Sequence, residues 1–280
     1  MRGVAYVDGV YLPLRAARVS VQDRGFQLGD SAYEVWAVRG GRLFDPAEHM
    51  TRLTRSLMEL RIAAPMSETA LFAVMRETAR RNHVRDGIVY VQISRGAASR
   101  DHAFPVGVRP TLVITAKNLD RDAIAARAEN GIKIVPLPEA RWARRDIKSV
   151  NLLPNLLARQ QAKQAGAFEA WFVDSAGYVT EGTASTAWIV AADGALRTRP
   201  LSNDLLHGVT RAAILRLARQ RQMQIAERAF TVAEAQGARE AFISSASNAA
   251  VPVVAIDGVP VGEGRPGPVA AALRAAYLGA

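Results

Sequence analysis

Short β-type segments alternate with amphipathic helical segments along this chain, and this alternation limits the folds that it can adopt. Apolar stretches at residues 87–94 and 110–115 follow two helical patterns, at 45–60 and 67–82. Beyond residue 166, β-type segments dominate and are joined by short turns. A chain of 280 residues is long enough to bury the cores of two modest domains. An α+β fold with two domains is therefore predicted.

A charged, helix-like stretch separates the two parts, and we expect residues 119–130 to be a linker. The N-terminal domain is then expected over residues 1–118 and the C-terminal domain over residues 131–280. The chain opens with an Asp8-Gly9 turn between β-type residues, which predicts a hairpin rather than a signal peptide. No apolar run is long enough to span a bilayer, so no membrane partner is expected.

The composition narrows the chemistry. Cysteine is absent, which excludes disulfides, zinc-thiolate sites and cysteine nucleophiles, and suits a reducing cytoplasm; no metal site is expected. The net charge of +10 comes from arginines scattered along the chain, and aromatic residues make up only 6%. Nucleic-acid binders concentrate their charge and add stacking aromatics, so small anions such as phosphates and carboxylates are the expected partners.

Lys148 is the residue with the clearest chemical potential. Lysine is scarce in this chain, and Lys148 lies between a β-type stretch at 132–137 and a helix predicted over 155–165. Partial desolvation at such a junction makes an amine nucleophilic, which suggests a Schiff base with a carbonyl cofactor or substrate. A surface lysine at a helix entrance would have the same local sequence, so other residues must decide between the two interpretations.

Other residues match what a pyridoxal phosphate site needs, namely a lysine, an acid for the ring nitrogen and donors for the phosphate. Glu181 ends a β-type segment and precedes Gly182, so it offers the acid. Val209 and Thr210 follow Gly208 at a helix start, where backbone N–H groups and a hydroxyl suit a phosphate. Taken singly, Glu181 could be a solvated strand end and Thr210 a helix cap. Further candidate phosphate donors are Arg52, Ser245 and Ser247.

Four motifs together resemble the class IV pyridoxal-phosphate aminotransferases. They are Gln22–Asp30 with Tyr33-Glu34, Glu48–Met50 with Arg52-Leu53, Asp146–Ser149 with Asn151–Leu153, and Thr180–Gly182. The resemblance implies a small α/β N-terminal domain and a larger C-terminal domain with a β-barrel-like core. It also implies pyridoxal 5'-phosphate bound between the domains of a homodimer. Lys148 would hold the cofactor, Glu181 would face its ring nitrogen, and the candidate donors named above would bind its phosphate.

Within that family, D-amino-acid transaminases carry an Arg-x-His pair in a loop of the N-terminal domain, and Arg100-Asp101-His102 resembles it. By this resemblance Arg100, His102 and Tyr33 hold the substrate α-carboxylate, in a loop that reaches the neighbouring subunit. A guanidinium and an imidazole are chemically suited to that role. The implied reaction is transamination between a D-amino acid, such as D-alanine, and a 2-oxo acid such as 2-oxoglutarate.

One departure from the family and several alternatives stay open. Where the family often has two threonines, this chain reads Ser245-Ala246-Ser247-Asn248, so a phosphate contact could be missing or moved to Ser247. Alternatives that use the same cofactor are a branched-chain L-amino-acid transaminase, an (R)-amine transaminase and an aminodeoxychorismate lyase. A non-enzymatic basic binding protein is the alternative from another class.

Overall fold

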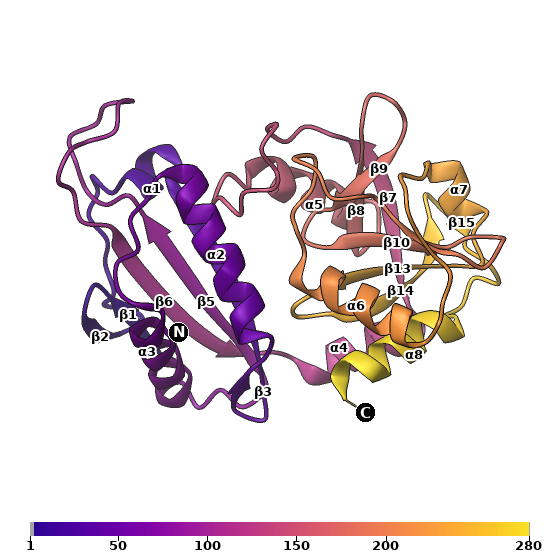
Figure 1. Cartoon of the computed structure of the whole chain (residues 1–280), viewed down its shortest axis with the longest axis horizontal. Coiled ribbons are helices and arrows are strands. Elements are labelled where there is room, and N and C mark those ends of the chain that lie inside the picture. The colour runs from indigo at the N-terminus through magenta and orange to yellow at the C-terminus, as the bar shows by residue number, and fades with distance from the viewer. Residues whose placement is uncertain (1–2, 280) are drawn as a thin grey trace. The chain divides into compact units, whose positions relative to one another are not determined.

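The computed structural model describes residues 3–279, and within this range the chain forms two compact units (Figure 1). Unit 1 contains the residues up to Leu119 and also the segment Ile147–Asn151, whereas unit 2 contains Asp120–Asp146 and the residues from Leu152 onward. Each unit combines helices with a β-sheet, so the predicted α+β class is confirmed. In residues 3–279, no helix is both long and apolar enough to cross a membrane.

Unit 1 has one sheet with the strand order β2-β1-β6-β5-β3-β4, and neighbouring strands run antiparallel. Its strands are β1 (Val4–Val7), β2 (Val10–Pro13), β3 (Ser31–Arg39), β4 (Arg42–Leu43), β5 (Gly87–Ser94) and β6 (Thr111–Asn118). Its helices are α1 (Arg24–Leu28), α2 (Pro46–Leu60) and α3 (Glu68–Arg81). The predicted opening hairpin is confirmed, because Val7 pairs with Val10 around Asp8-Gly9.

Helices α2 and α3 share one core with the sheet, since both contribute to the same buried cluster around Trp36. Helix α2 buries Met50, Leu53 and Leu57 on its apolar face, and it confirms the helical pattern at 45–60. The helix begins at Pro46, but Asp45 does not cap it. Asp45 has a left-handed backbone with φ 46°, and its side chain makes no capping hydrogen bond.

Unit 2 has a mixed sheet with the strand path β12-β11-β10-β13-β14-β7-β8-β9, and β15 pairs with β14. Its strands are β7 (Ile132–Pro138), β8 (Glu169–Val173), β9 (Val179–Gly182), β10 (Thr186–Val190), β11 (Leu196–Thr198), β12 (Ile225–Glu227), β13 (Glu240–Ser245), β14 (Ala249–Ile256) and β15 (Val259–Pro260). Its helices are α4 (Arg121–Asn130), α5 (Leu153–Gln164), α6 (Val209–Gln220), α7 (Val232–Gln236) and α8 (Pro268–Leu278).

The connection from β9 to β10 forces this sheet to curl. Along the strand path β9 and β10 are five strand spacings apart, which is about 24 Å in a flat sheet. Only residues 183–185 join them, and the four Cα–Cα steps from Gly182 to Thr186 span about 14 Å at most. The strand order therefore requires a curled, barrel-like sheet, as the family resemblance implied.

Alternating side chains give this sheet two apolar faces. Trp188 and Phe242 stack with ring centroids 5.5 Å apart and pack with residues of α6 and α8. Ile189, the next residue of β10, belongs instead to the other cluster, with Trp171 and Phe230. This alternation with a period of two is what a strand buried on both faces requires. Both faces of the sheet are therefore covered by apolar side chains. Glu181 lies near the end of its strand β9, and Ser245 ends its strand β13.

Two motif and linker segments form helices. The stretch at 22–30, part of the first motif, contains α1, because the Asp23 side chain accepts a hydrogen bond from the Phe26 N–H and Gly29 ends the helix at φ 70°. The expected linker at 119–130 is largely α4, which belongs to unit 2. Helix α6 begins at Val209, directly after Gly208, as the sequence predicted.

Candidate active site

Lys148 lies on the free edge of β3, in the segment that returns to unit 1. The carbonyl of Lys148 accepts a hydrogen bond from the Tyr33 N–H at 3.0 Å, and Val150 N–H donates to the Ser31 carbonyl at 3.1 Å. Ser149 forms a bridge with Ala32. These backbone contacts hold a short extended segment against β3, so the lysine is attached to a sheet rather than to a surface loop.

The amine of Lys148 faces an aromatic ring. Its Nζ lies 4.2 Å from the centroid of the Tyr33 ring, and the side chain of Lys148 is half-buried. Tyr33 in turn stacks on Tyr90 with centroids 5.6 Å apart, and burial raises the pKa of Tyr90 to about 12. Two of the predicted site residues, Lys148 and Tyr33, are therefore in direct contact within unit 1.

Behind Lys148, a buried carboxylate holds Arg52 in place. Arg52 donates to both oxygens of Glu34, from Nε at 2.8 Å and from Nη2 at 2.7 Å, and His49 Nδ1 lies 3.0 Å from the same carboxylate. Burial opposes ionisation of Glu34, but the charge of Arg52, its hydrogen bonds and the charge of Lys148 hold the pKa of Glu34 far below its ordinary value. The predicted phosphate ligand Arg52 thus has a fixed orientation.

The predicted carboxylate ligands Arg100 and His102 lie on the long loop between β5 and β6. Both side chains are exposed, and within residues 3–279 neither has a hydrogen-bond or ion-pair partner. The peptide between them is fixed, because the Asp101 carbonyl accepts a hydrogen bond from Arg24 Nη1 at 2.6 Å. The loop therefore presents two unpaired cationic or polar side chains from an anchored backbone.

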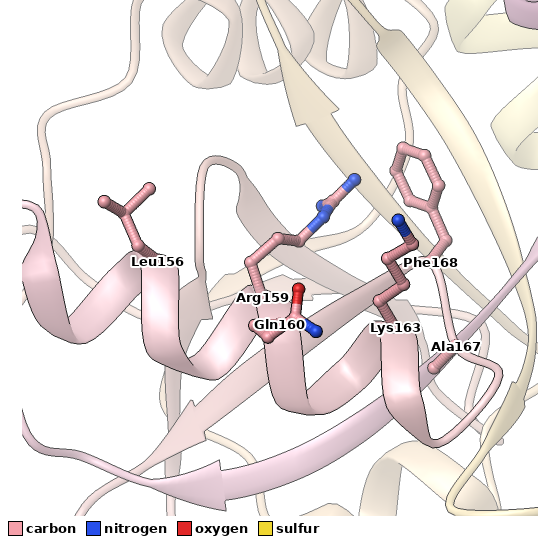
Figure 2. Close-up of a pocket in the computed structure, with 6 residues that line it drawn as sticks. All are labelled: Leu156, Arg159, Gln160, Lys163, Ala167 and Phe168. Atoms are coloured by element: carbon pink, nitrogen blue, oxygen red, sulfur yellow. The ribbon is translucent and has the colours of Figure 1, made fainter.

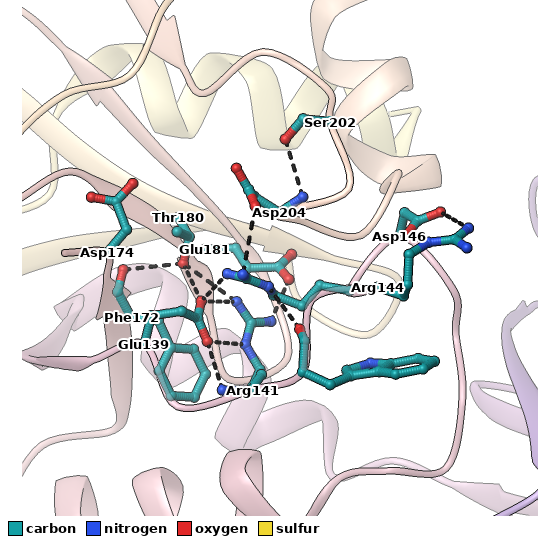
Figure 3. Close-up of polar contacts among 12 residues, drawn as sticks. Glu139, Arg141, Arg144, Asp146, Phe172, Asp174, Thr180, Glu181, Ser202 and Asp204 are labelled. Atoms are coloured by element: carbon teal, nitrogen blue, oxygen red, sulfur yellow. Dashed lines mark hydrogen bonds and ion pairs between the residues drawn. The ribbon is translucent and has the colours of Figure 1, made fainter. Parts of the chain in front are cut away.

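In unit 2, Glu181 is buried at the end of β9, and two groups hold its carboxylate, of which Figure 3 shows Arg141. Arg141 Nη1 donates to its carboxylate, and the Leu206 N–H donates to both oxygens at 3.1 and 3.2 Å. Arg141 also donates from Nη2 to Glu139 at 2.6 Å. Burial raises the pKa of Glu181 and outweighs the opposite effect of Arg141. Because burial disfavours its charged form, a cationic partner would stabilise the Glu181 carboxylate.

The start of α6 and the end of β13 meet at one corner of unit 2. Gly208 is the N-cap residue of α6 and makes no side-chain cap. The first N–H groups of the helix, which include those of Val209 and Thr210, therefore receive no hydrogen bond from a capping side chain. A Cβ at Gly208 would lie 3.0 Å from the Thr186 hydroxyl, and Thr186 pairs with Ser244 across the sheet. Val209, Thr210 and Ser245 are thereby brought together by the sheet register.

The two serines at this corner share one partner. The side-chain amide of Asn248 donates to the Ser245 hydroxyl at 3.4 Å and to the Ser247 hydroxyl at 3.3 Å. The Thr210 hydroxyl lies 3.4 Å from the Tyr277 hydroxyl. A group of hydroxyls beside an uncapped helix start is chemically suited to an anion such as a phosphate.

Comparison with known proteins identifies the family. The model of the family "Amino-transferase class IV" matches residues 31–256. This chain belongs to the class IV aminotransferases. It is 37% identical over 274 residues to the D-alanine aminotransferase of Staphylococcus haemolyticus, covering 97% of this chain and 95% of that protein. It is 38% identical over 251 residues to the D-alanine aminotransferase of Bacillus licheniformis, covering 90% and 87%.

Solved structures give the same family. The branched-chain amino acid aminotransferase of Escherichia coli superposes with a TM-score of 0.93 at 27% identity, covering 100% of this chain and 94% of that one. The T.th. branched-chain amino acid aminotransferase, solved with pyridoxamine 5'-phosphate, superposes with a TM-score of 0.90 at 26% identity, covering 99% and 93%. The predicted enzyme class is confirmed: this class IV aminotransferase is an enzyme that depends on pyridoxal 5'-phosphate.

The residues of this aminotransferase fit that cofactor. Glu181 is a buried carboxyl whose environment favours a cationic partner, which matches a protonated ring nitrogen. A Cβ at Gly208 would make a tight contact with the Thr186 hydroxyl, so the backbone at the α6 start lies close to the sheet, and the first N–H groups of this helix are suited to a phosphate. Unit 2 thus supplies groups that suit the ring nitrogen and the phosphate of the cofactor.

Sequence reasoning missed three buried residues of these clusters. Glu34 was seen only as part of a motif, although a single acid in an otherwise apolar strand is a signal for a buried pair. His49 was read as one position of the apolar face of α2. Arg141 gave no signal, because it opens a run of arginines that looks like an ordinary charged surface.

A separate hollow on unit 2 lies beside α5 (Figure 2). It is lined by Leu156, Arg159, Gln160, Lys163, Ala167 and Phe168. The side chains in Figure 2 come from α5 and from the segment that follows it. This lining contains no residue that the sequence assigned to the cofactor or the substrate.

Proposed function

We propose that this class IV aminotransferase transfers an amino group between a D-amino acid, such as D-alanine, and a 2-oxo acid such as 2-oxoglutarate. One observation carries the proposal: Arg100 and His102 stand exposed and unpaired, within the described residues, on an anchored loop of unit 1. An unpaired guanidinium next to an imidazole is a ready site for a carboxylate, which every amino acid and 2-oxo acid carries. The names of the relatives at 37% and 38% identity point the same way.

In this proposal each unit 1 residue has a defined task. Arg100 and His102 bind the substrate carboxylate together with Tyr33. Lys148 holds the cofactor and later moves a proton to and from the substrate Cα as general base and acid. The Tyr33 ring, 4.2 Å from the Lys148 amine, limits where that amine can turn. Glu34 keeps Arg52 oriented for the phosphate.

The unit 2 residues act on the cofactor. Pyridoxal phosphate supplies a ring that withdraws electrons from the substrate Cα, and it does so best when the ring nitrogen is protonated. Glu181 is proposed to hold that proton, and Arg141 keeps its carboxylate in place. The N–H groups of Val209 and Thr210 and the hydroxyls of Ser245 and Ser247 are proposed to bind the phosphate. Asn248 orients those two hydroxyls.

A branched-chain L-amino-acid transaminase is the second candidate, because the solved structures at 26% and 27% identity bear that name. The two candidates differ in how they hold the substrate carboxylate, and a branched-chain enzyme is expected to lack the Arg-His pair. The presence of Arg100 and His102 therefore favours the D-amino acid.

The test is the visible absorption of the protein loaded with pyridoxal phosphate, before and after adding D-alanine. L-Leucine is added to a parallel sample. Loss of the cofactor band with D-alanine only, restored by 2-oxoglutarate, supports the proposal. A response to L-leucine only would replace it with the branched-chain reaction.

A variant pair makes this test specific for the loop. The Arg100→Ala, His102→Ala double variant is expected to respond to D-alanine only at much higher concentration. Arg109→Ala is the matched control, since Arg109 is an exposed arginine at the other end of the same loop. A double variant that responds like the control would refute the carboxylate assignment.

We further propose that the enzyme is a homodimer that works in the cytoplasm. The family resemblance supports the dimer, and the absence of cysteine suits a reducing compartment. Size-exclusion chromatography with light scattering tests the dimer: a mass equal to that of one chain at micromolar concentration would refute it.

A further inference from the structure

A buried ion-pair cluster lies under the loop that carries Arg100 and His102. Asp30 accepts hydrogen bonds from two arginines, from Arg24 Nε at 2.8 Å and from Arg95 Nε and Nη2 at 2.7 and 2.9 Å. The side chains of Arg24, Asp30 and Arg95 are 4, 11 and 10% exposed. Burial opposes ionisation of Asp30, but the two arginines hold its pKa below the ordinary value. The cluster is therefore charged and rigid.

Arg95 ties this cluster to the end of α2. Its Nη1 donates to the Arg61 carbonyl and its Nη2 to the Leu60 carbonyl, both at 2.7 Å. These carbonyls lie at the C-terminal end of α2, which has no intrahelical partner for them and attracts cations. Arg95 is thus anchored at several points, and Asp30 takes its position from Arg95.

Arg24 passes that position on to the loop. Its Nη1 donates to the Asp101 carbonyl at 2.6 Å, across 77 residues of sequence. Asp101 stands between Arg100 and His102, so this one bond fixes the peptide from which both side chains project. The Asp101 side chain accepts from the Ala103 N–H at 3.1 Å, which makes the turn itself rigid.

The backbone closes the base of the same loop. The Arg24 N–H donates to the Gly96 carbonyl at 2.9 Å, and the Ala98 N–H donates to the Gln22 carbonyl at 3.2 Å. At Gly96, with φ +108°, a Cβ would lie 2.0 Å from the Arg109 carbonyl oxygen. The two arms of the loop therefore touch at its base, and the Arg24 side chain reaches past this base to the carboxylate-binding pair.

We infer that Arg24 is a positioning residue for the substrate carboxylate, because its guanidinium joins the fixed Asp30 carboxylate to the peptide between Arg100 and His102. The inference rests on the proposed function, in which those two residues bind the carboxylate. Two guanidinium charges against one carboxylate also leave net positive charge beneath this pair, which favours an anionic substrate group.

The forked shape of arginine is essential to this role. Lysine carries the same charge but offers one nitrogen, which cannot keep the geometry of both bonds. Arg24→Lys is therefore expected to raise KM for D-alanine about tenfold, the effect of one charge-assisted hydrogen bond. The kcat value is expected to change by less than about threefold, because the variant leaves Lys148 untouched and weakens binding rather than the proton transfer.

A double-mutant cycle separates positioning from a general loss of stability. If Arg24 acts through the carboxylate-binding pair, Arg24→Lys adds almost nothing to the KM of an Arg100→Ala, His102→Ala background. A full tenfold increase in that background would overturn the inference. Arg109→Lys is the matched control, because Arg109 is an exposed arginine of the same loop that takes no part in the Asp30 cluster. An equal increase in KM for Arg109→Lys would also overturn the inference.

Limited trypsin digestion gives a readout that needs neither cofactor nor substrate. Arg100 is exposed, and cleavage after it requires the loop to open. Arg24→Lys is expected to speed cleavage after Arg100 severalfold more than Arg109→Lys does, with an unchanged circular dichroism spectrum. Equal cleavage in wild type and Arg24→Lys would refute the anchoring even in an enzyme active on D-alanine. If Arg24→Lys is cleaved faster than wild type but the wild-type enzyme does not act on D-alanine, the proposed function is refuted and the anchoring still holds.

Discussion

Replacing Glu34 by Gln is expected to loosen the helix that carries Arg52. The Glu34 side chain is 0% exposed and that of Arg52 is 10% exposed, so their pair lies out of water. Gln keeps the shape of Glu but removes the charge, so the buried Arg52 guanidinium loses the carboxylate that accepts two of its hydrogen bonds. Breaking a buried ion pair in this way costs about 3–5 kcal/mol.

The effect should be local and measurable by hydrogen exchange. About 3 kcal/mol corresponds to roughly a hundredfold faster exchange of amides that open with α2 (Pro46–Leu60) and β3. We expect this acceleration in Glu34→Gln at pH 7. The carboxylate contributes fully there, since its pKa lies below the unfolded value; the contribution is lost only as the pH falls below about 4.

Glu77→Gln is the matched control on α3. Glu77 also accepts bonds from two arginines, Arg80 and Arg81, but it does so on the surface, where water replaces a lost partner. Its exchange pattern should stay close to that of wild type. The reasoning about burial is refuted if Glu34→Gln accelerates exchange in α2 no more than Glu77→Gln does in α3.

Three further predictions concern the two units separately. Lys148→Ala should abolish transamination and leave the circular dichroism spectrum unchanged. The control variant Lys163→Ala, on the exposed face of α5, should stay active. Measurable turnover in Lys148→Ala would exclude the assigned role. Glu139 has a pKa lowered to about 2, since hydrogen bonds and charge from Arg141 overcome its burial, so its contribution to stability is lost as the pH falls from about 4 toward 2. Acid titration followed by circular dichroism should therefore be flatter for Glu139→Gln than for wild type, and identical curves would contradict this. Gly96→Ala should raise KM for D-alanine strongly, because its Cβ would lie 2.0 Å from a carbonyl oxygen. The control is Gly107→Ala in the same loop, which also has a positive φ (+72°) but open space, and should bind D-alanine normally. Equal KM values for the two variants would disprove the closed loop base.

Local patterns were sufficient for much of the fold. The helical patterns of α2 and α3 and the Asp8-Gly9 turn were read from neighbouring residues, and the structure confirms each element. Patterns of this kind were predictable because helix periodicity, caps and turns depend on residues a few positions apart.

The sequence by itself determined the chemical groups of the candidate site, because Lys148, Glu181 and the Arg100-Asp101-His102 loop each stand in a recognisable motif. Only the tertiary structure decided what surrounds them. The Lys148 segment joins β3 of unit 1, Arg141 reaches Glu181 across 40 positions, and Arg24 reaches Asp101 across 77. No local pattern encodes such contacts, because they depend on which strand edges and buried surfaces meet when the whole sheet assembles.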